Sequence, residues 1–226
     1  MERVKTIMGD VPAIVIAPHV EDKNTDKIAE VIAKELDTFT IINKGWNRSN
    51  NFDYWNDLAN CNNIQHLQQD VIKQEFLDPI IHFKNIIQKT IDQRVFVFII
   101  HGVGNHIRNK APDLDMIIGH GAGTPPKYSC NLRFKDGLAY FLDQQGIVAY
   151  EGKAGGKYAG KSKNNLNQLF RQWYHDSDVH SFQLEIVKEF REDQLIELTG
   201  QAIASVIDDM IFFDDTSDVV INPKSI

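Results

Sequence analysis

Two histidines follow strongly apolar segments of the chain. His19 comes after residues 13–17 and a proline, and His101 comes directly after residues 95–100. Both segments are continuously apolar, which is typical of strands buried on both faces. Open α/β sheets bind ligands at the carboxyl ends of their strands, so the two imidazoles can meet at one edge of such a sheet.

Acidic residues beside His19 can complete a metal site with these imidazoles. Two neutral imidazoles and one carboxylate leave an open position on zinc, where a hydrolytic site holds its water. Asp22 lies three residues after His19, a spacing typical of a short metal-binding turn, and Glu21 and Asp26 are alternative ligands. The competing interpretation is that each histidine is a hydrogen-bonded structural residue. The other histidines of the chain are expected on the surface or in loops.

A second carboxylate lies in an alternating segment near the C-terminal end of the chain. Within residues 181–187, Gln183 and Glu185 fall on one face of an expected strand, and Phe182 and Leu184 fall on the other. A glutamate flanked by apolar side chains is desolvated, which raises its carboxyl pKa and suits a general base. The alternative is an edge-strand glutamate that faces solvent.

Residues 155–162 satisfy the phosphate-binding pattern G-x-x-x-x-G-K-[ST], beginning with Gly155-Gly156. In a nucleotide-binding protein the amides of such a loop hold phosphates and its lysine reaches the terminal phosphate. Here residues 151–154 separate the loop from the preceding strand, and no later apolar segment ends in a magnesium-binding aspartate. A flexible loop that closes over an anionic substrate is therefore the favoured interpretation, with nucleotide binding as the alternative.

Four basic residues are candidates for binding an acidic substrate in a protein of net charge −7: Arg48, Lys157, Lys161 and Arg191. Arginine stays charged and binds a carboxylate with two parallel hydrogen bonds. Arg48 is the strongest candidate because it directly follows an expected strand. For any single one of the four, a solvated surface position is the favoured interpretation.

The composition excludes some classes of function. The chain has 226 residues, 42% of them hydrophobic, and its acidic charge does not suit binding to nucleic acid. It has no apolar signal segment and no segment of membrane-spanning length, so we expect a cytoplasmic protein without a membrane partner. Its two cysteines, Cys61 and Cys130, lack metal-binding spacing and imply no disulfide. The oligomeric state is left open.

Alternating strands and helices must position these residues. Strands are expected at residues 13–17, 39–42, 95–100, 146–150 and 179–187. Helices are expected from residue 24 or 25 to 36, over 62–91 with an interruption near Pro79, and over 132–142, 166–173 and 194–212. Residues 102–130 are expected to form a long functional loop. This order predicts a single three-layer α/β/α domain over residues 1–214 with a mostly parallel mixed sheet, followed by a polar tail, residues 215–226.

These motifs, taken in order, resemble the N-formylglutamate amidohydrolase family and, more distantly, phage poly-γ-glutamate hydrolases. The resemblance covers most of the chain, and the Gln-Leu-Glu segment is its most specific element. The matching segments are Pro18-His19, Asn24-Thr25-Asp26, Asn47-Arg48, His101-Gly102, residues 119–129, Gly155-Gly156 with Tyr158 and Gly160, and Gln183-Leu184-Glu185. Val20-Glu21 replaces the family's glycine after Pro-His, and Ile100 replaces its aspartate before the third-strand histidine.

The resemblance implies a zinc-carboxypeptidase-like fold and one zinc ion per chain, held by His19, Asp22 and His101. It implies that Glu185 is the general base and proton shuttle and that Arg48 binds a substrate carboxylate. Gly155, Gly156, Tyr158 and Gln183 would form the rest of the substrate site. The implied activity is hydrolysis of an N-formyl, N-acyl or γ-glutamyl amide of a small acidic amino-acid derivative. The alternatives are a nucleotide-binding protein that uses residues 155–162, and a non-catalytic binding protein with a hydrolase fold.

Overall fold

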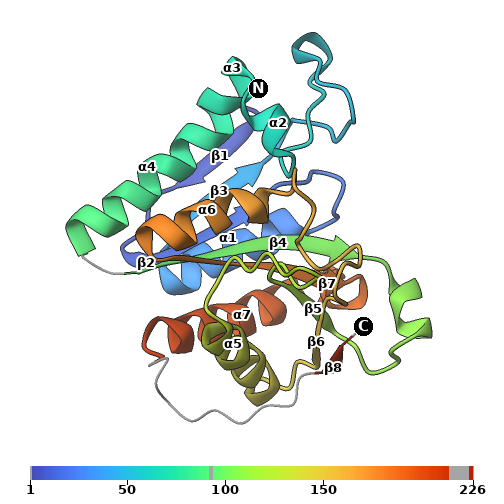
Figure 1. The fold of residues 1–226 in the computed structure, drawn as a ribbon. Coiled ribbons are helices and arrows are strands. Elements are labelled where there is room, and N and C mark those ends of the chain that lie inside the picture. The colour runs from blue at the N-terminus through green and yellow to red at the C-terminus, as the bar shows by residue number, and fades with distance from the viewer. Residues whose placement is uncertain (1, 92–93, 214–223, 226) are drawn as a thin grey trace.

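A computed structural model describes residues 2–91, 94–213 and 224–225 of the chain. Within these residues, eight strands form one mixed sheet in the order β1-β3-β2-β4-β7-β5-β6-β8 (Figure 1). Neighbouring strands are parallel, except that β1 is antiparallel to β3 and β5 is antiparallel to β7. The strands are β1 Val4–Ile7, β2 Val11–Ala17, β3 Thr38–Asn43, β4 Val95–Val103, β5 Met116–Gly119, β6 Ala149–Glu151, β7 Val179–Val187 and β8 Lys224–Ser225.

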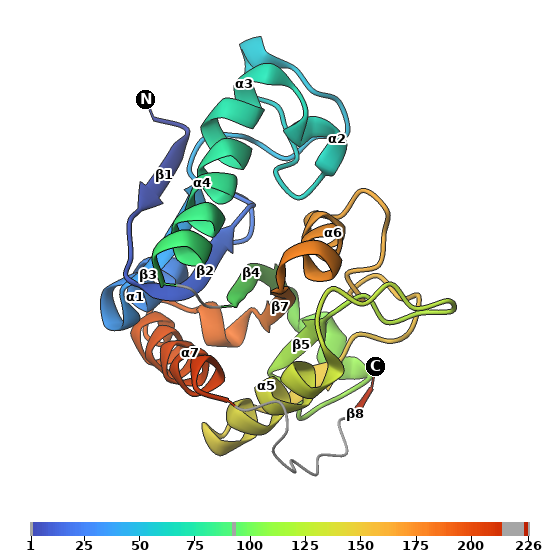
Figure 2. The ribbon, with the colours of Figure 1, turned by 60° about the vertical axis from the view of Figure 1, so that its left-hand side comes forward.

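Helices cover both faces of the sheet and make the fold a three-layer α/β/α domain (Figures 1 and 2). One face packs against α1, α5 and α7, and the other packs mainly against α4 and α6. The α-helices are α1 Thr25–Leu36, α2 Ile64–Leu67, α3 Asp70–Ile72, α4 Asp78–Ile86, α5 Leu132–Gln144, α6 Leu166–Ser177 and α7 Ile196–Ile211. Shorter 3₁₀ segments lie at Tyr54–Asn56, Asn105–Asn109 and Glu189–Arg191, and π-helical segments lie at Lys73–Leu77 and Ile87–Ile91.

The central strands are apolar throughout because both of their faces are covered. In β2, Val15 packs toward the α1 and α7 side, while Ile14 and Ile16 pack toward the α4 side. The same division holds in β4, where Phe98 belongs to the first cluster and Ile99 to the second. Burial on both faces explains why these strands read as continuous apolar runs in the sequence.

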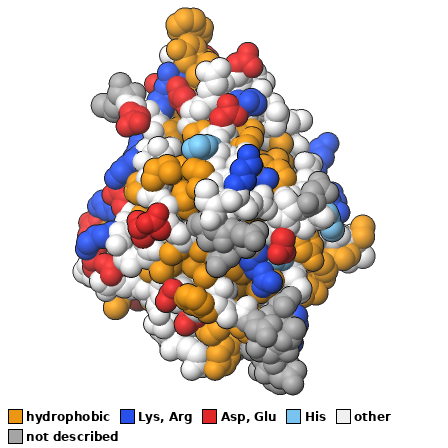
Figure 3. Space-filling model, turned by 90° about the vertical axis from the view of Figure 1, so that its left-hand side faces the viewer, with side chains coloured by type: hydrophobic (Ala, Val, Ile, Leu, Met, Phe, Trp, Pro, Cys, Tyr) orange, Lys and Arg blue, Asp and Glu red, His pale blue; other side chains and the backbone are white. Residues whose placement is uncertain are grey.

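On the face drawn in Figure 3, acidic and basic side chains are interspersed among apolar and uncharged ones. No helix in the described ranges has both the length and the apolar character needed to cross a membrane. Both cysteines are free and buried.

Several expected elements differ from those observed. The sheet contains β1, which the sequence analysis did not predict, and β5, which lies inside the expected long loop. Each is only four residues long, too short to show a clear strand pattern. The expected strand at 146–150 is displaced to β6 because Gly146, with φ of 73°, lies in the turn that follows α5.

The expected interruption near Pro79 is instead a change of helical hydrogen bonding. The π-helical segment Lys73–Leu77 ends where α4 begins, and Pro79 lies in the first turn of α4. This position suits proline because its missing N–H is not needed there. Of the expected polar tail, Lys224 and Ser225 pair with β6 as β8, and residues 215–223 and 226 lie outside the described ranges.

Candidate metal centre and catalytic cleft

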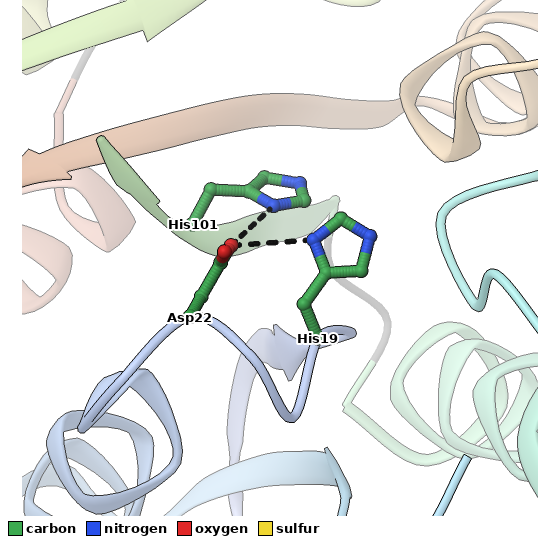
Figure 4. A group of neighbouring side chains, drawn as sticks. All are labelled: His19, Asp22 and His101. Carbon is green, nitrogen blue, oxygen red and sulfur yellow. Dashed lines mark hydrogen bonds and ion pairs between the residues drawn. The ribbon is translucent and has the colours of Figure 1, made fainter. Parts of the chain in front are cut away.

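His19, Asp22 and His101 converge at the carboxyl ends of β2 and β4 (Figure 4). These strands are parallel neighbours, so their carboxyl ends lie at one edge of the sheet. Asp22 Oδ2 lies 3.2 Å from His19 Nδ1 and 3.5 Å from His101 Nδ1. One ligand atom from each residue lies within 4.8 Å of the others. Both imidazoles are buried, with exposed fractions of 6% and 3%.

A tight turn after β2 brings Asp22 back toward His19. Thr25 Oγ1 donates to the Asp22 carbonyl at 2.7 Å, and the Thr25 backbone N–H donates to the same oxygen at 3.1 Å. Asn24 has a left-handed backbone with φ of 66°, a conformation that asparagine tolerates better than most residues. Its buried side chain donates to the Arg191 carbonyl at 2.8 Å, which fixes the turn against the rest of the edge.

The charge states of Asp22 and His101 suit a cation. Burial would raise the pKa of Asp22, but hydrogen bonds with His101 and His19 outweigh it and hold that pKa well below its usual range. The Gly102 backbone N–H also donates to Asp22 Oδ2, at 3.1 Å. Burial lowers the pKa of His101 to about 4, against the opposing effect of Asp22. His101 is therefore neutral near pH 7, which is the state in which an imidazole binds a metal ion.

Two of the three donor separations fit a zinc ion closely, and all three lie within 4.8 Å. Zinc bonds of about 2.0–2.1 Å in a tetrahedral arrangement place ligand atoms about 3.3 Å apart. The separations of 3.2 Å and 3.5 Å around Asp22 Oδ2 lie close to this value. Two imidazole nitrogens and one carboxylate oxygen also match the donor types that zinc prefers. His101 Nε2 is buried and has no hydrogen-bond partner among the described residues.

Glu185 lies beside this group on the neighbouring strand. In the parallel pairing of β4 with β7, Glu185 is the register partner of His101, so the two side chains are on the same face. β7 lies between β4 and β5 and is buried along its whole length, which rules out the solvent-facing edge position. Burial and the nearby Asp22 charge raise the pKa of Glu185 to about 8.

Gln183 orients the Glu185 carboxyl group. Its Nε2 donates to Glu185 Oε1 at 2.6 Å, and its Oε1 accepts from Asn165 Nδ2 at 3.0 Å. Asn165 is the N-cap of α6, where its Oδ1 accepts from the Asn167 backbone N–H. This capping bond fixes the orientation of the Asn165 amide, and through it the orientation of Gln183. Gln183 is thus engaged with protein groups on both ends of its amide, and it also lines the cleft described below, so its role in substrate binding stays a prediction.

A cleft of about 260 Å³ opens onto these residues. Its charged and polar walls are formed by His19, Asp22, Arg48, Asn60, Asn62, His101, His106, Lys157, Tyr158, Asn165, Gln183 and Glu185. A second cleft, of about 540 Å³, contains Gly155, Gly156 and Lys161 and shares Lys157 and Asn165 with the first. The glycine-containing loop expected to bind substrate therefore borders the site.

The two alternative metal ligands and the basic residue Lys161 each have another partner in the protein. Glu21 accepts a hydrogen bond from the Arg48 backbone N–H, and Asp26 pairs with Lys44 at 2.8 Å. Lys161 Nζ donates to the Thr124 carbonyl at 3.2 Å.

Arg191 is buried and donates to three backbone carbonyls, each one or two residues from a site residue. The acceptors are Lys23 at 2.6 Å, Ile186 at 3.0 Å and Val103 at 3.2 Å. It is therefore not available to a substrate carboxylate.

The loop 155–162 lacks the geometry of a nucleotide-binding loop. In such a loop the lysine and serine begin the helix that follows. Here α6 begins only at Leu166, after the Asn165 N-cap, and Ser162 is an exposed loop residue. The segment therefore matches the nucleotide-binding pattern in its residue types but not in its position relative to the following helix.

Four polar side chains of the cleft were not predicted from the sequence: Asn60, Asn62, His106 and Asn165. Asparagine is common in loops for purely local reasons, so these positions carry no distinct signal. Residues 60 and 62 also lie in a loop far along the chain from either histidine. Only the folded chain places them at this edge of the sheet.

Comparison with protein-family profiles and with curated protein sequences finds no match. Solved structures, in contrast, match nearly the whole chain. N-formylglutamate amidohydrolase from Ralstonia eutropha JMP134 aligns with a TM-score of 0.59 and 11% identity, covering 92% of this chain and 97% of that one. A bacteriophage poly-gamma-glutamate hydrolase aligns with a TM-score of 0.51 and 12% identity, covering 91% and 87%.

A third similar structure is that of YNDL in a zinc-free form, with a TM-score of 0.50 and 16% identity, covering 91% of this chain and 88% of that one. At these identities the likeness is one of fold. The chain has the zinc-carboxypeptidase-like α/β/α fold of these hydrolases, as its motifs predicted.

Proposed function

We propose that the protein is a metal-dependent amidohydrolase that cleaves an amide of an acidic, amino-acid-derived substrate. The observation that carries this proposal is the convergence of His19, Asp22 and His101 beside the buried carboxyl group of Glu185. The fold shared with N-formylglutamate amidohydrolase and poly-gamma-glutamate hydrolase supports it. The zinc-free form of the similar protein YNDL supports zinc as the metal.

His19, Asp22 and His101 would hold one zinc ion. When bound, such an ion lowers the pKa of a coordinated water and polarises the amide carbonyl. Glu21 and Asp26 are not needed as ligands, since each has another partner. Asp22 is therefore our choice for the acidic ligand.

Glu185 would act as the general base and then as the general acid. Its Oε1 is held by Gln183, which leaves Oε2 to take a proton from the attacking water and to pass it to the leaving nitrogen. With a pKa of about 8, the carboxyl group holds a proton at neutral pH in the metal-free protein. A cation held by His19, Asp22 and His101 favours the carboxylate form. Metal binding therefore prepares the base for the reaction.

Cationic side chains on the cleft wall would select an acidic substrate. Arg48 and Lys157 both line the cleft and are exposed, so both can meet a ligand. Arg48 would bind a carboxylate through two parallel hydrogen bonds. Tyr158 and the backbone of Gly155 and Gly156 would border the rest of the substrate.

The test is the metal content of the purified protein, compared with that of a His19→Ala, His101→Ala double variant. We expect about one zinc per chain in the wild type and none in the variant. N-formyl, N-acyl and γ-glutamyl amides of acidic amino acids are then assayed for hydrolysis. A wild type that takes up no added zinc would refute the proposal. Tight substrate binding without turnover in zinc-loaded protein would indicate a binding protein, and nucleotide-dependent thermal stabilisation lost in Lys161→Ala would indicate a nucleotide site.

A further inference from the structure

The Asn60 side chain contacts the Nε2 atom of the His19 ring. Asn60 Oδ1 lies 3.1 Å from His19 Nε2, while His19 Nδ1 faces Asp22 Oδ2 at 3.2 Å. The two ring nitrogens of His19 thus face different groups. If Asn60 presents its amide oxygen to Nε2, this nitrogen carries the proton of the neutral ring. If it presents its NH₂ group, the proton is on Nδ1.

Neighbouring backbone fixes the orientation of the Asn60 amide. The Asn62 backbone N–H donates to Asn60 Oδ1 at 2.9 Å, so this atom is the amide oxygen and accepts hydrogen bonds. His19 Nε2 must then be the donor of the bond to Asn60. A neutral imidazole has only one N–H, so its Nδ1 is left with a free lone pair toward Asp22.

The loop that carries Asn60 is itself held in place. The Asn60 backbone N–H donates to Nδ1 of the buried His66 at 2.9 Å. The Leu166 backbone N–H, at the start of α6, donates to the Asn62 carbonyl at 3.0 Å. The Asn60 oxygen is therefore positioned by both its own loop and α6, and it does not depend on a mobile side chain.

We propose that Asn60 is a positioning residue that fixes His19 in the tautomer with its proton on Nε2 and its Nδ1 free for the metal ion. This inference rests on the metal site of the proposed function. A lone pair that faces a carboxylate oxygen at 3.2 Å is unfavourable without a cation between them, and this arrangement is suited to a metal ion. Hydrogen bonds of this kind typically strengthen metal binding 10- to 100-fold.

The experiment compares wild type with Asn60→Leu, Asn60→Asp and the control Asn51→Leu, an exposed residue of the same loop. Nitrogen-15 NMR of histidine-labelled, zinc-loaded protein at about pH 8 reports which nitrogen of each ring carries the proton. The His19 signals are assigned with a His19→Ala variant. Zinc affinity is measured by competition with a chromophoric chelator, and urea unfolding of the metal-free proteins monitors stability.

We expect His19 of the zinc-loaded wild type to carry its proton on Nε2 and to bind the metal ion through Nδ1. Asn60→Leu removes the acceptor of this proton and should bind zinc about 10- to 100-fold more weakly, while Asn60→Asp, which keeps an acceptor oxygen, should restore the affinity. Asn51→Leu should match the wild type. A lower urea midpoint in Asn60→Leu with an unchanged tautomer and zinc affinity would reduce Asn60 to a structural residue and overturn the inference. If the wild type binds no zinc, the proposed metal site itself is wrong. This result is distinct from a failure of the Asn60 inference, in which the wild type still binds zinc.

Discussion

The buried carboxyl group of Glu185 predicts an unusual pH dependence of stability in the metal-free protein. A carboxyl group whose pKa is raised on folding keeps a proton that the unfolded chain releases. Between pH 4.5 and about 8 the unfolded state therefore binds fewer protons, and the free energy of unfolding falls as pH rises. The substitution that removes this effect is Glu185→Gln, because a glutamine keeps the shape and can still accept from Gln183.

The expected magnitude follows from the proton affinities. A tenfold difference in proton affinity corresponds to about 1.4 kcal/mol, so between about pH 5 and about pH 9 the Glu185 carboxyl group should lower the free energy of unfolding by about 4 kcal/mol. Glu185→Gln should lack this loss. Since the other titrating groups are the same in both proteins, subtracting the variant's pH profile from that of the wild type isolates Glu185.

The assay is urea unfolding of chelator-treated protein at several pH values, followed by tryptophan fluorescence. Trp46 is fully buried and reports the loss of the core. The control is Glu197→Gln, which changes an exposed glutamate of α7 and should keep the wild-type profile. If Glu185→Gln loses stability with rising pH as steeply as the wild type, Glu185 is not a buried proton carrier and its proposed role as the base fails.

Further predictions concern activity, metal content and packing. Glu185→Gln should keep its zinc yet hydrolyse substrate about 10²- to 10⁴-fold more slowly, and near-normal turnover would exclude it as the base. His101→Ala should lose the metal, whereas retention of one zinc per chain by elemental analysis would remove this residue from the ligand set. Arg48→Gln should raise KM for acidic substrates about tenfold or more with unchanged zinc affinity, and an unchanged KM would exclude a carboxylate contact. Gly102→Ala would place a Cβ 2.5 Å from the Arg191 guanidinium carbon. Urea unfolding should therefore show a free energy of unfolding lower by about 1–3 kcal/mol, and an unchanged midpoint would contradict this contact.

The parts of the site carried on strands were predictable from the sequence. His101 directly continues a buried apolar run, and His19 follows another one after a single proline, so both had to lie at strand ends. Glu185 could be placed on a strand face by simple alternation. Parallel pairing of adjacent strands then accounts for their proximity, because carboxyl ends of parallel strands share one edge of the sheet.

The parts carried on loops were not predictable. Asn60 reaches His19 from a loop 41 residues away, and the contact depends on how that loop packs against α6. The hydrogen bonds of Gln183 were also not predictable, because alternation shows which face a side chain occupies but not which partners it meets there. β5 was missed because its four residues lie in a segment rich in glycine and proline, where the antiparallel pairing with β7 is the stabilising interaction.

The three hydrogen bonds of Arg191 have a consequence for how this scaffold can diversify. One guanidinium group links the backbone beside Asp22, the end of β4 and the end of β7. The distances between the proposed metal ligands Asp22 and His101 and the proposed base Glu185 therefore do not depend on the length or sequence of the loops that connect these segments. Residues 104–115 and 152–163 could be exchanged or extended to accept other substrates while the reaction chemistry stays the same.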